Sequence, residues 1–415
     1  MKGDFSRWET EGEENLQGVL HQQGRVLLDS DWNDQTRLTL AWQEGAARDV
    51  IGPDVAAVPA HTPDAFKVSE ARVVGSDVEL DILPGGAWVN GLAVDLPGEP
   101  PDPTAAVTRK ATYLQPPIQD PAGVVGDIAD GVRDAVVLEV WRSALNGFQT
   151  PETLIEPALG GPDTTERVQT ALRFRLFRLG EDDTCRTIVE RLQDDFSQKG
   201  KLKVTLLPTI SSGGDCPVEE GGGYIGFEHH LYRVEIAQVN SAQPMFKWSQ
   251  FNGGLVGRGE CDLAGPDKKI TITANDQAIK TSGLNAFYLE VVEYDQDQGY
   301  WRVTYGADVT LDGDELVVGT ERYTEASRPS GRAFFRLWNG IEDISGYLKV
   351  PVGSDPTELR DGIRLEFDAS SGDNYQPGDY WTFKVRAGGL GNPDPLIDDQ
   401  PPQGVHYQRV PLAIL

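Results

Sequence analysis

The chain has 415 residues and a formal net charge of −28, from 65 acidic and 37 basic residues. Nucleic-acid phosphates and anionic membranes repel so acidic a surface, which argues against a general binder of either. The length and the 39% hydrophobic content allow two or three substructures with cores of their own, while 46 glycines and 27 prolines favour a turn-rich β protein. The acidic surface and Arg-rich basic set also suit a halophilic or GC-rich source.

The cysteines and the apolar runs bear on where the protein folds. Cys185, Cys216 and Cys261 are an odd number without close spacing, which predicts reduced thiols rather than a disulfide framework or a four-ligand zinc site. Residues 1–14 are charged throughout, and no run approaches ~18 apolar residues. We expect synthesis and folding in the cytoplasm, without membrane insertion.

Residues 1–53 are predicted to form a docking segment and a helix. Val26, Leu27 and Leu28 predict a buried strand, and the acceptors that follow at residues 29–31 predict a helix start. Apolar residues at helical spacing continue to Val50, and Gly52-Pro53 predicts the stop, so we expect this helix to cover a sheet. In the segment before it, Phe5 and Trp8 are predicted anchors against the protein's own second half or a neighbouring subunit.

Residues 54–210 are predicted to form a first, β-rich domain of mixed structure. Asn90-Gly91 between apolar residues predicts a type I′ hairpin, and residues 135–141 predict a central strand. Residues 182–196 predict a short helix with Thr184 as a possible cap, and residues 202–207 predict a strand.

The strand predicted at residues 168–176 alternates apolar with polar residues and has a basic outer face. Arg173, Arg175 and Arg178 are conspicuous there in so acidic a protein. Two readings stay open for these arginines. They pair with acidic residues on neighbouring strands, or they meet an acidic surface on another copy of the chain.

Residues 211–223 are Gly-rich and predict a linker, and residues 224–415 predict a second, all-β domain. Some ten short strands separated by polar or Gly turns favour an antiparallel sandwich or a barrel-like sheet pair. Asp312-Gly313, Asp361-Gly362 and Asp373-Asn374 predict turns. The predicted fold class is therefore mainly β with a few helices.

Several residue patterns suggest chemistry only weakly. Asp29, Asp31 and Asn33 match the first ligands of a calcium loop, but the later positions do not fit, and helix capping is favoured. Glu228 and His230 would share one face of a strand without a third partner, which favours a polar pair beside a turn. Because the sequence contains none of the common catalytic motifs, we predict no enzyme and no catalytic, cofactor or metal-binding residues.

Aromatic residues crowd the second half, among them Trp248, Trp301, Trp338 and Trp381. Core packing in a β domain explains them, and a protein interface or a carbohydrate-binding face could use the same residues.

Several spaced motifs resemble one domain family. Two lie near the start, in residues 1–7 and 19–33, and others lie at residues 156–165, 231–236, 246–249, 375–381, 405–407 and 411–415. Together they resemble an uncharacterised family encoded in gene clusters for extracellular contractile injection systems, the phage-tail-like particles of bacteria and archaea. The similarity extends over essentially the whole chain.

The resemblance implies a structural component of such a particle, in or around the baseplate, with other particle subunits as partners. It also implies a homo-oligomer in place, because such particles have rotational symmetry. Release of the particle would take the protein outside the cell. The alternatives are a fibre-associated or carbohydrate-binding module of the same particle and, third, a hydrolase that uses His230.

Overall fold

The computed structural model describes the chain except for residues 4, 6–14, 76, 115–132, 160–162, 195, 197, 209, 212–218, 221, 326, 352, 370–374 and 390–391. The described part is mainly β, which confirms the predicted fold class. Its α-helices are α1 (Asp29–Ile51), α2 (Pro151–Leu154), α3 (Cys185–Asp194) and α4 (Asp276–Thr281). No helix among these residues is long and apolar enough to cross a membrane.

Two sheets in the first half pack face to face as an N-terminal sandwich. The larger has the order β2 (Val68–Val74), β3 (Asp77–Ile82), β6 (Val107–Tyr113), β8 (Arg167–Arg178), β7 (Asp134–Leu145) and β25 (Gln408–Ile414). The smaller has the order β1 (Ala56–Ala57), β4 (Gly85–Val89) and β5 (Leu92–Leu96). Alternate residues of both sheets, such as Leu138, Phe174 and Val94, fill their shared core.

A second sandwich lies in the C-terminal half. One sheet has the order β20 (Gly340–Asp343), β13 (Met245–Ser249), β12 (His230–Ile236) and β23 (Tyr380–Val385). The facing sheet has the order β21 (Thr357–Arg360), β22 (Ile363–Phe367), β9 (Leu202–Leu206) and β24 (Ile397–Gln400). A short hairpin of β10 (Ile210–Ser211) and β11 (Glu219–Glu220) follows β9.

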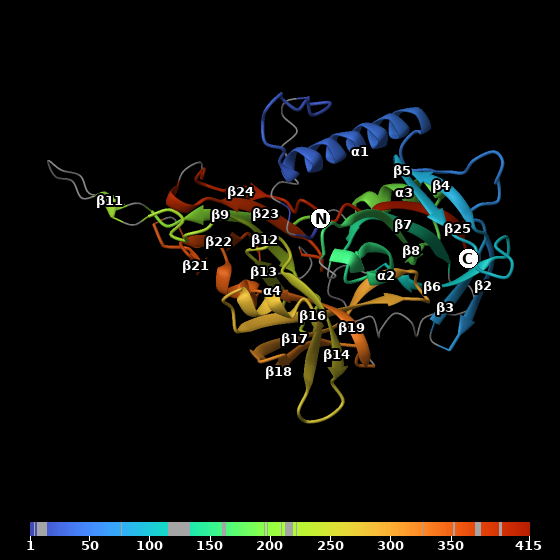
Figure 1. Cartoon of the computed structure of the whole chain (residues 1–415). Helices are drawn as coiled ribbons and strands as arrows, with labels where there is room; N and C mark the ends of the chain where they lie inside the picture. The colour runs from blue at the N-terminus through green and yellow to red at the C-terminus, as the bar shows by residue number, and fades with distance from the viewer. Residues whose placement is uncertain are drawn as a thin grey trace.

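Six strands that lie in the sequence between β13 and β20 close into a barrel. Its order is β14 (Leu255–Asp262), β15 (Lys269–Ala274), β18 (Glu315–Thr324), β17 (Tyr300–Asp312), β16 (Ala286–Asp295) and β19 (Gly331–Trp338), which pairs again with β14. Figure 1 shows the C-terminal sandwich on the left, the barrel below, the N-terminal sandwich on the right and α1 above them. The second half thus contains both of the predicted arrangements, a sandwich and a barrel.

The sheets do not follow the predicted domain boundary at residues 211–223. β9 precedes this segment and pairs with β22 and β24, whereas β25 comes last and pairs with β7 of the first half. The predicted division into 54–210 and 224–415 is therefore wrong for these two strands. The reason is that strand pairing at long range leaves no mark in local composition.

The predicted helix is confirmed as α1, but the strand before it is not. Residues 25–28 form no strand, and the side chains of Val26, Leu27 and Leu28 are exposed. Gly52 ends α1 as predicted, with a φ of 98° and an N–H that donates to the Arg48 carbonyl at 2.8 Å. The expectation that α1 covers a sheet is wrong, because Leu38 is its one buried side chain.

The predicted turns and the Thr184 cap are confirmed where the structure describes them, whereas the capping predicted for Asp29 and Asp31 is not seen, because no side chain caps α1. Asn90 and Gly91 have φ values of 47° and 90°, as a type I′ turn requires, and Gly313 and Asp361-Gly362 also have positive φ in hairpin turns. At the start of α3 the Thr187 N–H donates to Thr184 Oγ1 at 3.3 Å. The Asp373-Asn374 turn lies outside the described residues.

Candidate functional site

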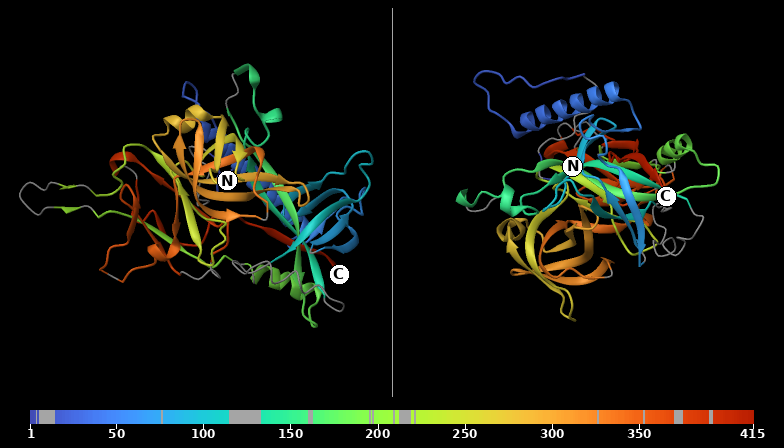
Figure 2. Two further views of the ribbon diagram at one scale, coloured as in Figure 1. Left: turned by 90° about the horizontal axis from the view of Figure 1, so that it is seen from below. Right: turned by 90° about the vertical axis from the view of Figure 1, so that its right-hand side faces the viewer.

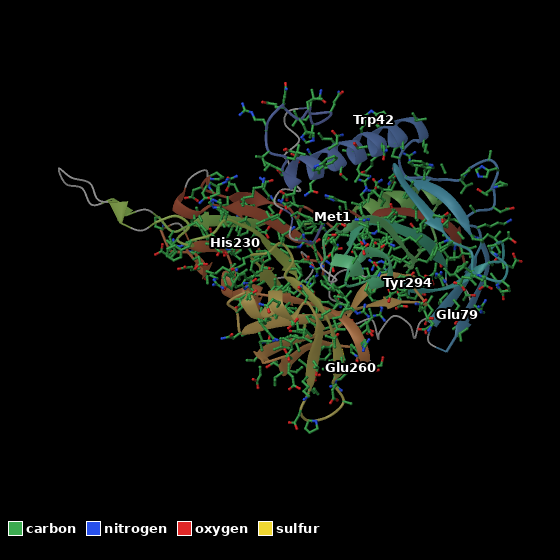
Figure 3. All side chains as sticks on the ribbon, viewed as in Figure 1. Met1, Trp42, Glu79, His230, Glu260 and Tyr294 are labelled. Atoms are coloured by element: carbon green, nitrogen blue, oxygen red, sulfur yellow. The ribbon has the colours of Figure 1, made fainter. Side chains whose placement is uncertain are left out.

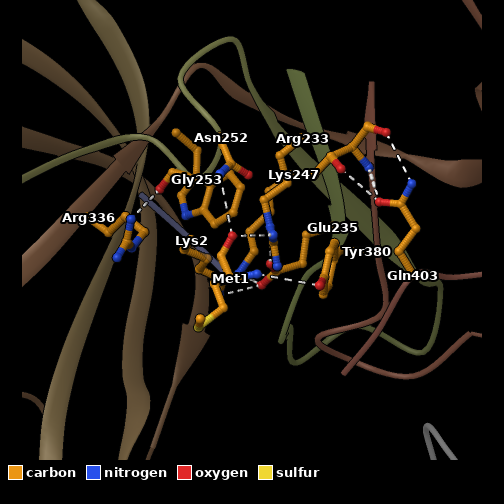
Figure 4. Close-up of polar contacts among 12 residues, drawn as sticks. Met1, Lys2, Arg233, Glu235, Lys247, Asn252, Gly253, Arg336, Tyr380 and Gln403 are labelled. Atoms are coloured by element: carbon orange, nitrogen blue, oxygen red, sulfur yellow. Dashed lines mark hydrogen bonds and ion pairs between the residues drawn. The ribbon is translucent and has the colours of Figure 1, made fainter. Parts of the chain in front are cut away.

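The first three residues lie between the C-terminal sandwich and the barrel (Figure 4). The amino group of Met1 donates to Tyr380 Oη of β23 at 3.4 Å, and its carbonyl accepts from Arg233 of β12 at 3.2 Å. Gly3 and Asn252 exchange two hydrogen bonds of 2.9 Å, one from each residue. The start of the chain is thus held by segments about 230 to 380 residues away.

A buried charge network surrounds this segment. The carboxylate of Glu235 accepts from Lys2 at 2.6 Å, from Lys247 at 3.0 Å and from Arg233 at 2.8 Å. Burial alone would raise the pKa of Glu235, but these cations hold it well below its usual range. Burial also lowers the pKa of Lys2 to about 8, against the opposing charge of Glu235.

The same network reaches into the barrel. Lys247 of β13 forms a second ion pair with Glu290 of β16, and Trp338 of β19 donates from Nε1 to the other Glu290 oxygen at 2.8 Å. These side chains are almost fully buried. Because removing one partner of a buried ion pair leaves an uncompensated charge, the network fixes how sandwich and barrel are placed.

The predicted anchors Phe5 and Trp8 belong to the segment that follows. Phe5 is half-buried and packs on Gly3, since a Cβ on Gly3 would lie 2.5 Å from its ring and 2.8 Å from the Glu166 carboxylate. Trp8 lies outside the described residues. Docking of the N-terminal segment on the second half is seen at Met1–Gly3, and a contact of Phe5 or Trp8 with another subunit stays a prediction.

Glu139 of β7 is the centre of a second buried network. It is fully buried and pairs with Arg173 of β8 and, at 2.7 Å, with Arg409 of β25. Arg173 lies over the rings of Trp141, Tyr300 and Tyr407. Burial alone would raise the pKa of Glu139, but the surrounding arginines lower it to about 2.

The three arginines of β8 are half-buried and have partners within the chain. Arg173 and Glu139 are direct cross-strand partners, as are Arg178 and Asp134, whose atoms are 2.7 Å apart. Arg175 donates to the hydroxyl of Thr112 and to the backbone carbonyl of Tyr113, both at 2.7 Å. The first reading, cross-strand pairing, describes Arg173 and Arg178.

Two carboxylates of the loop after β7 lie near the N-terminal segment. The Asn146 amide donates to Asp163 at 2.6 Å and to Glu166 at 3.1 Å. Burial raises the pKa of both carboxyls, and one oxygen of each accepts no hydrogen bond from the described residues. The Asn146 amide thus bridges the two carboxyls.

The weaker chemical candidates lie at separate places in the fold. Asp29 and Asp31 lie in the first turn of α1, where negative charge favours the helix, although no side chain caps it. His230 Nε2 lies 3.4 Å from Glu228, and His229 Nδ1 accepts from the Ala387 N–H. No group of three or more His, Cys, Asp or Glu with metal-binding geometry occurs among the described residues.

A shallow cavity of about 450 Å³ opens between the end of α1, α3 and β25. Four of its polar lining residues bind one another: Asp54 accepts from Gln193 at 2.7 Å, and Asn90 donates to Gln408 at 2.9 Å. These contacts join α1, α3, the β4–β5 hairpin and β25, so the cavity is a seam between elements.

The aromatic residues of the second half lie mainly in cores. Trp338 and Trp381 are fully buried, and Trp248 nearly so. The core-packing explanation is therefore confirmed for these three, and they cannot form a carbohydrate-binding face.

Exposed apolar residues gather instead where they were predicted to be buried. The strap at residues 15–28 exposes Leu20, Val26 and Leu27, and α1 exposes Trp32 and Trp42. The sequence pattern shows which helix positions are apolar but not whether the chain has a surface to cover them.

Comparison with known proteins adds one match. Residues 1–199 match the model of a family described as a family of unknown function (DUF6519). The matched range contains α1, α3 and all strands of the N-terminal sandwich except β25. No curated protein and no solved structure matches the chain.

Proposed function

We propose that the chain is a structural component of an extracellular contractile injection system, a phage-tail-like particle, positioned in or around its baseplate. The proposal starts from the spaced motifs that resemble a family from such gene clusters. It assigns the chain a role in assembly rather than in catalysis.

The observation that carries the proposal is where the resembling segments meet. Residues 1–7 supply Lys2, residues 231–236 supply Arg233 and Glu235, and residues 246–249 supply Lys247. Residues 375–381 supply Tyr380, which accepts from the Met1 amino group. Four motifs far apart in the sequence thus build one buried network that locks a sandwich to a barrel. A buried charge network that holds the sandwich and the barrel in one arrangement supports a rigid structural subunit.

Purified particles provide the test. We expect mass spectrometry to find the chain in particles from the native cells at a constant ratio to tube and sheath subunits. An electron-microscopy map should contain density of the sandwich-and-barrel shape near the baseplate, and particles from cells that lack the gene should lose this density. A chain that is abundant in the cells but absent from their particles would contradict the proposal.

A further inference from the structure

The cavity between α1, α3 and β25 keeps hydrogen-bonding groups that its own residues do not use. In the right-hand view of Figure 2, α1 passes over the red end of the chain, and the green α3 lies beside that end. Trp42, which Figure 3 labels on the side of α1 that faces away from the sheets, does not line the cavity. The volume of about 450 Å³ lies within the usual range of roughly 300 to 1,000 Å³ for small-molecule sites.

Four glutamines of the lining have side-chain groups without a partner among the described residues. The Gln376 amide makes no side-chain hydrogen bond there. Gln193 and Gln198 each donate from Nε2 to an aspartate, which leaves their carbonyl oxygens without a donor. Gln408 accepts at Oε1 and leaves its Nε2 unused. The cavity thus offers both donors and acceptors, which suits a ligand with hydroxyl groups.

The charge of the cavity is the reverse of the charge of the chain. Acidic residues outnumber Lys and Arg by 65 to 37 overall. Among the described lining residues Asp54 is the one acid, whereas Arg48, Arg409 and His406 are basic. Asp54 already accepts from Gln193. A carboxylate ligand therefore meets cations here instead of the acidic surface that would repel it.

Arg48 is the cation best placed to bind a carboxylate. It lies in the last turn of α1, and its side chain is 49% exposed. Its ion pair with Glu44 is 3.7 Å long, beyond hydrogen-bond distance, and Glu44 also pairs with Arg142 at 3.2 Å. Arg409 is instead paired with Glu139 at 2.7 Å. The guanidinium of Arg48 therefore keeps donors in the fork geometry that binds a carboxylate through two hydrogen bonds.

We infer that the cavity binds a saccharide that bears a carboxylate, such as a uronic acid. Arg48 binds the carboxylate, and the glutamine amides bind the ring hydroxyls. A simple anion such as phosphate or acetate would use donors alone and leave the carbonyl oxygens of Gln193 and Gln198 unpaired, whereas hydroxyl groups supply the protons that these oxygens accept. The shallow shape suits the end unit of a longer sugar chain.

Ligand-observed NMR of the full chain with matched probes tests the inference. We expect at least one of glucuronate, galacturonate and mannuronate to bind with a Kd on the order of 1 mM, as suits a small polar ligand. The corresponding hexose, which lacks the carboxylate, should bind at least tenfold more weakly, and so should acetate, which lacks the hydroxyls.

Two results with these probes overturn the inference. One is that no uronate binds with a Kd below about 10 mM. The other is that the hexose or acetate binds as tightly as the uronate. Neither result bears on the proposed particle role, which the mass spectrometry of particles tests separately.

Two variants locate the binding in the cavity. Arg48→Ala should make the uronate bind as weakly as its hexose, and Gln376→Ala should weaken the uronate and the hexose alike by about threefold or more. Arg186→Ala is the matched control, because Arg186 also pairs with a glutamate four residues away, but its side chain is 88% exposed on α3 and does not line the cavity. This control should bind like the wild type. Unchanged uronate binding by Arg48→Ala, with an unchanged circular dichroism spectrum, overturns the inference.

Discussion

Asp379 is a buried carboxyl whose ionisation destabilises the folded state. It directly precedes β23 and is only 3% exposed. Its two oxygens accept from the Gln376 N–H at 2.9 Å and from Gln198 Nε2 at 2.8 Å. Burial nevertheless raises its pKa to about 6, because these two hydrogen bonds do not replace the lost hydration.

This pKa predicts a pH-dependent cost that Asp379→Asn removes. Between the ordinary pKa of 3.8 and about 6 the folded state binds more protons than the unfolded state, so this group lowers the free energy of unfolding as pH rises through that window. We expect the wild type to lose up to about 3 kcal/mol relative to Asp379→Asn between pH 4 and pH 7, measured by urea unfolding.

The exposed Asp355 provides the control for this comparison, because its side chain is 83% exposed. The wild type and Asp355→Asn should keep a nearly constant difference over the same pH range. A constant difference for Asp379→Asn as well would show that its carboxyl is not perturbed by burial.

At the scale of elements, α1 is held by few contacts, and the β4–β5 hairpin makes one of them. Arg142 of β7 pairs with Glu44 at 3.2 Å, while the hairpin turn approaches the helix backbone at the same residue. A Cβ on Gly91 would lie 2.2 Å from the Glu44 carbonyl oxygen. Glycine is therefore required at this turn by its positive φ and by the approach of α1.

A pair of glycine variants separates these two requirements. Gly313→Ala changes a hairpin turn with positive φ and open space, so it should cost only about 1 kcal/mol of backbone strain. Gly91→Ala should cost clearly more in urea unfolding and should speed hydrogen exchange in α1, because the helix has to move. Equal costs with unchanged exchange would mean that the hairpin does not position α1.

Features that depend on consecutive residues were predicted more accurately from the sequence than features that depend on contacts between distant residues. Asn90-Gly91, Thr184 and Gly52 were predictable because a turn, a cap or a stop depends on a few consecutive residues. Leu27 and Leu28 were misread as a strand, since an apolar run does not reveal whether anything covers it.

The residues of the candidate site could not be brought together from local sequence patterns. Arg233 and Glu235 alternate with apolar residues in β12, which indicates a charged face but gives no sign that Lys2 and Lys247 would bury it. The arginines of β8 were recognised as unusual, yet only the register of β7 against β8 identifies Glu139 as a partner.

At the scale of the whole molecule, each end of the chain completes the other half. Met1–Gly3 docks on the C-terminal sandwich, and β25 is an edge strand of the six-stranded sheet in the N-terminal sandwich. β9 likewise belongs to the first half of the sequence but pairs with β22 in the C-terminal sandwich. The two halves are thus joined by sheet hydrogen bonds as well as by side-chain contacts.

This exchange predicts that the halves stay together after the chain is cut. A protease site inserted within residues 212–218 should give two fragments that co-elute in gel filtration and unfold in one transition, because β9, β25 and Met1–Gly3 each remain paired with the other fragment. Fragments that separate without denaturant would instead support two independent domains.

The position of β25 also has a consequence for how the protein is made. Its partner β7 ends at residue 145, and β25 begins at residue 408, so a ribosome adding roughly 5 to 20 residues per second needs about 13 to 53 s to supply the missing strand. During that time the nascent chain carries an unpaired strand edge of Val136, Val137 and Leu138, the kind of edge that recruits other strands. Neighbouring ribosomes on one messenger would hold several such edges close together, so a chaperone that covers β7 during translation would protect the yield of this protein more than one that acts after release.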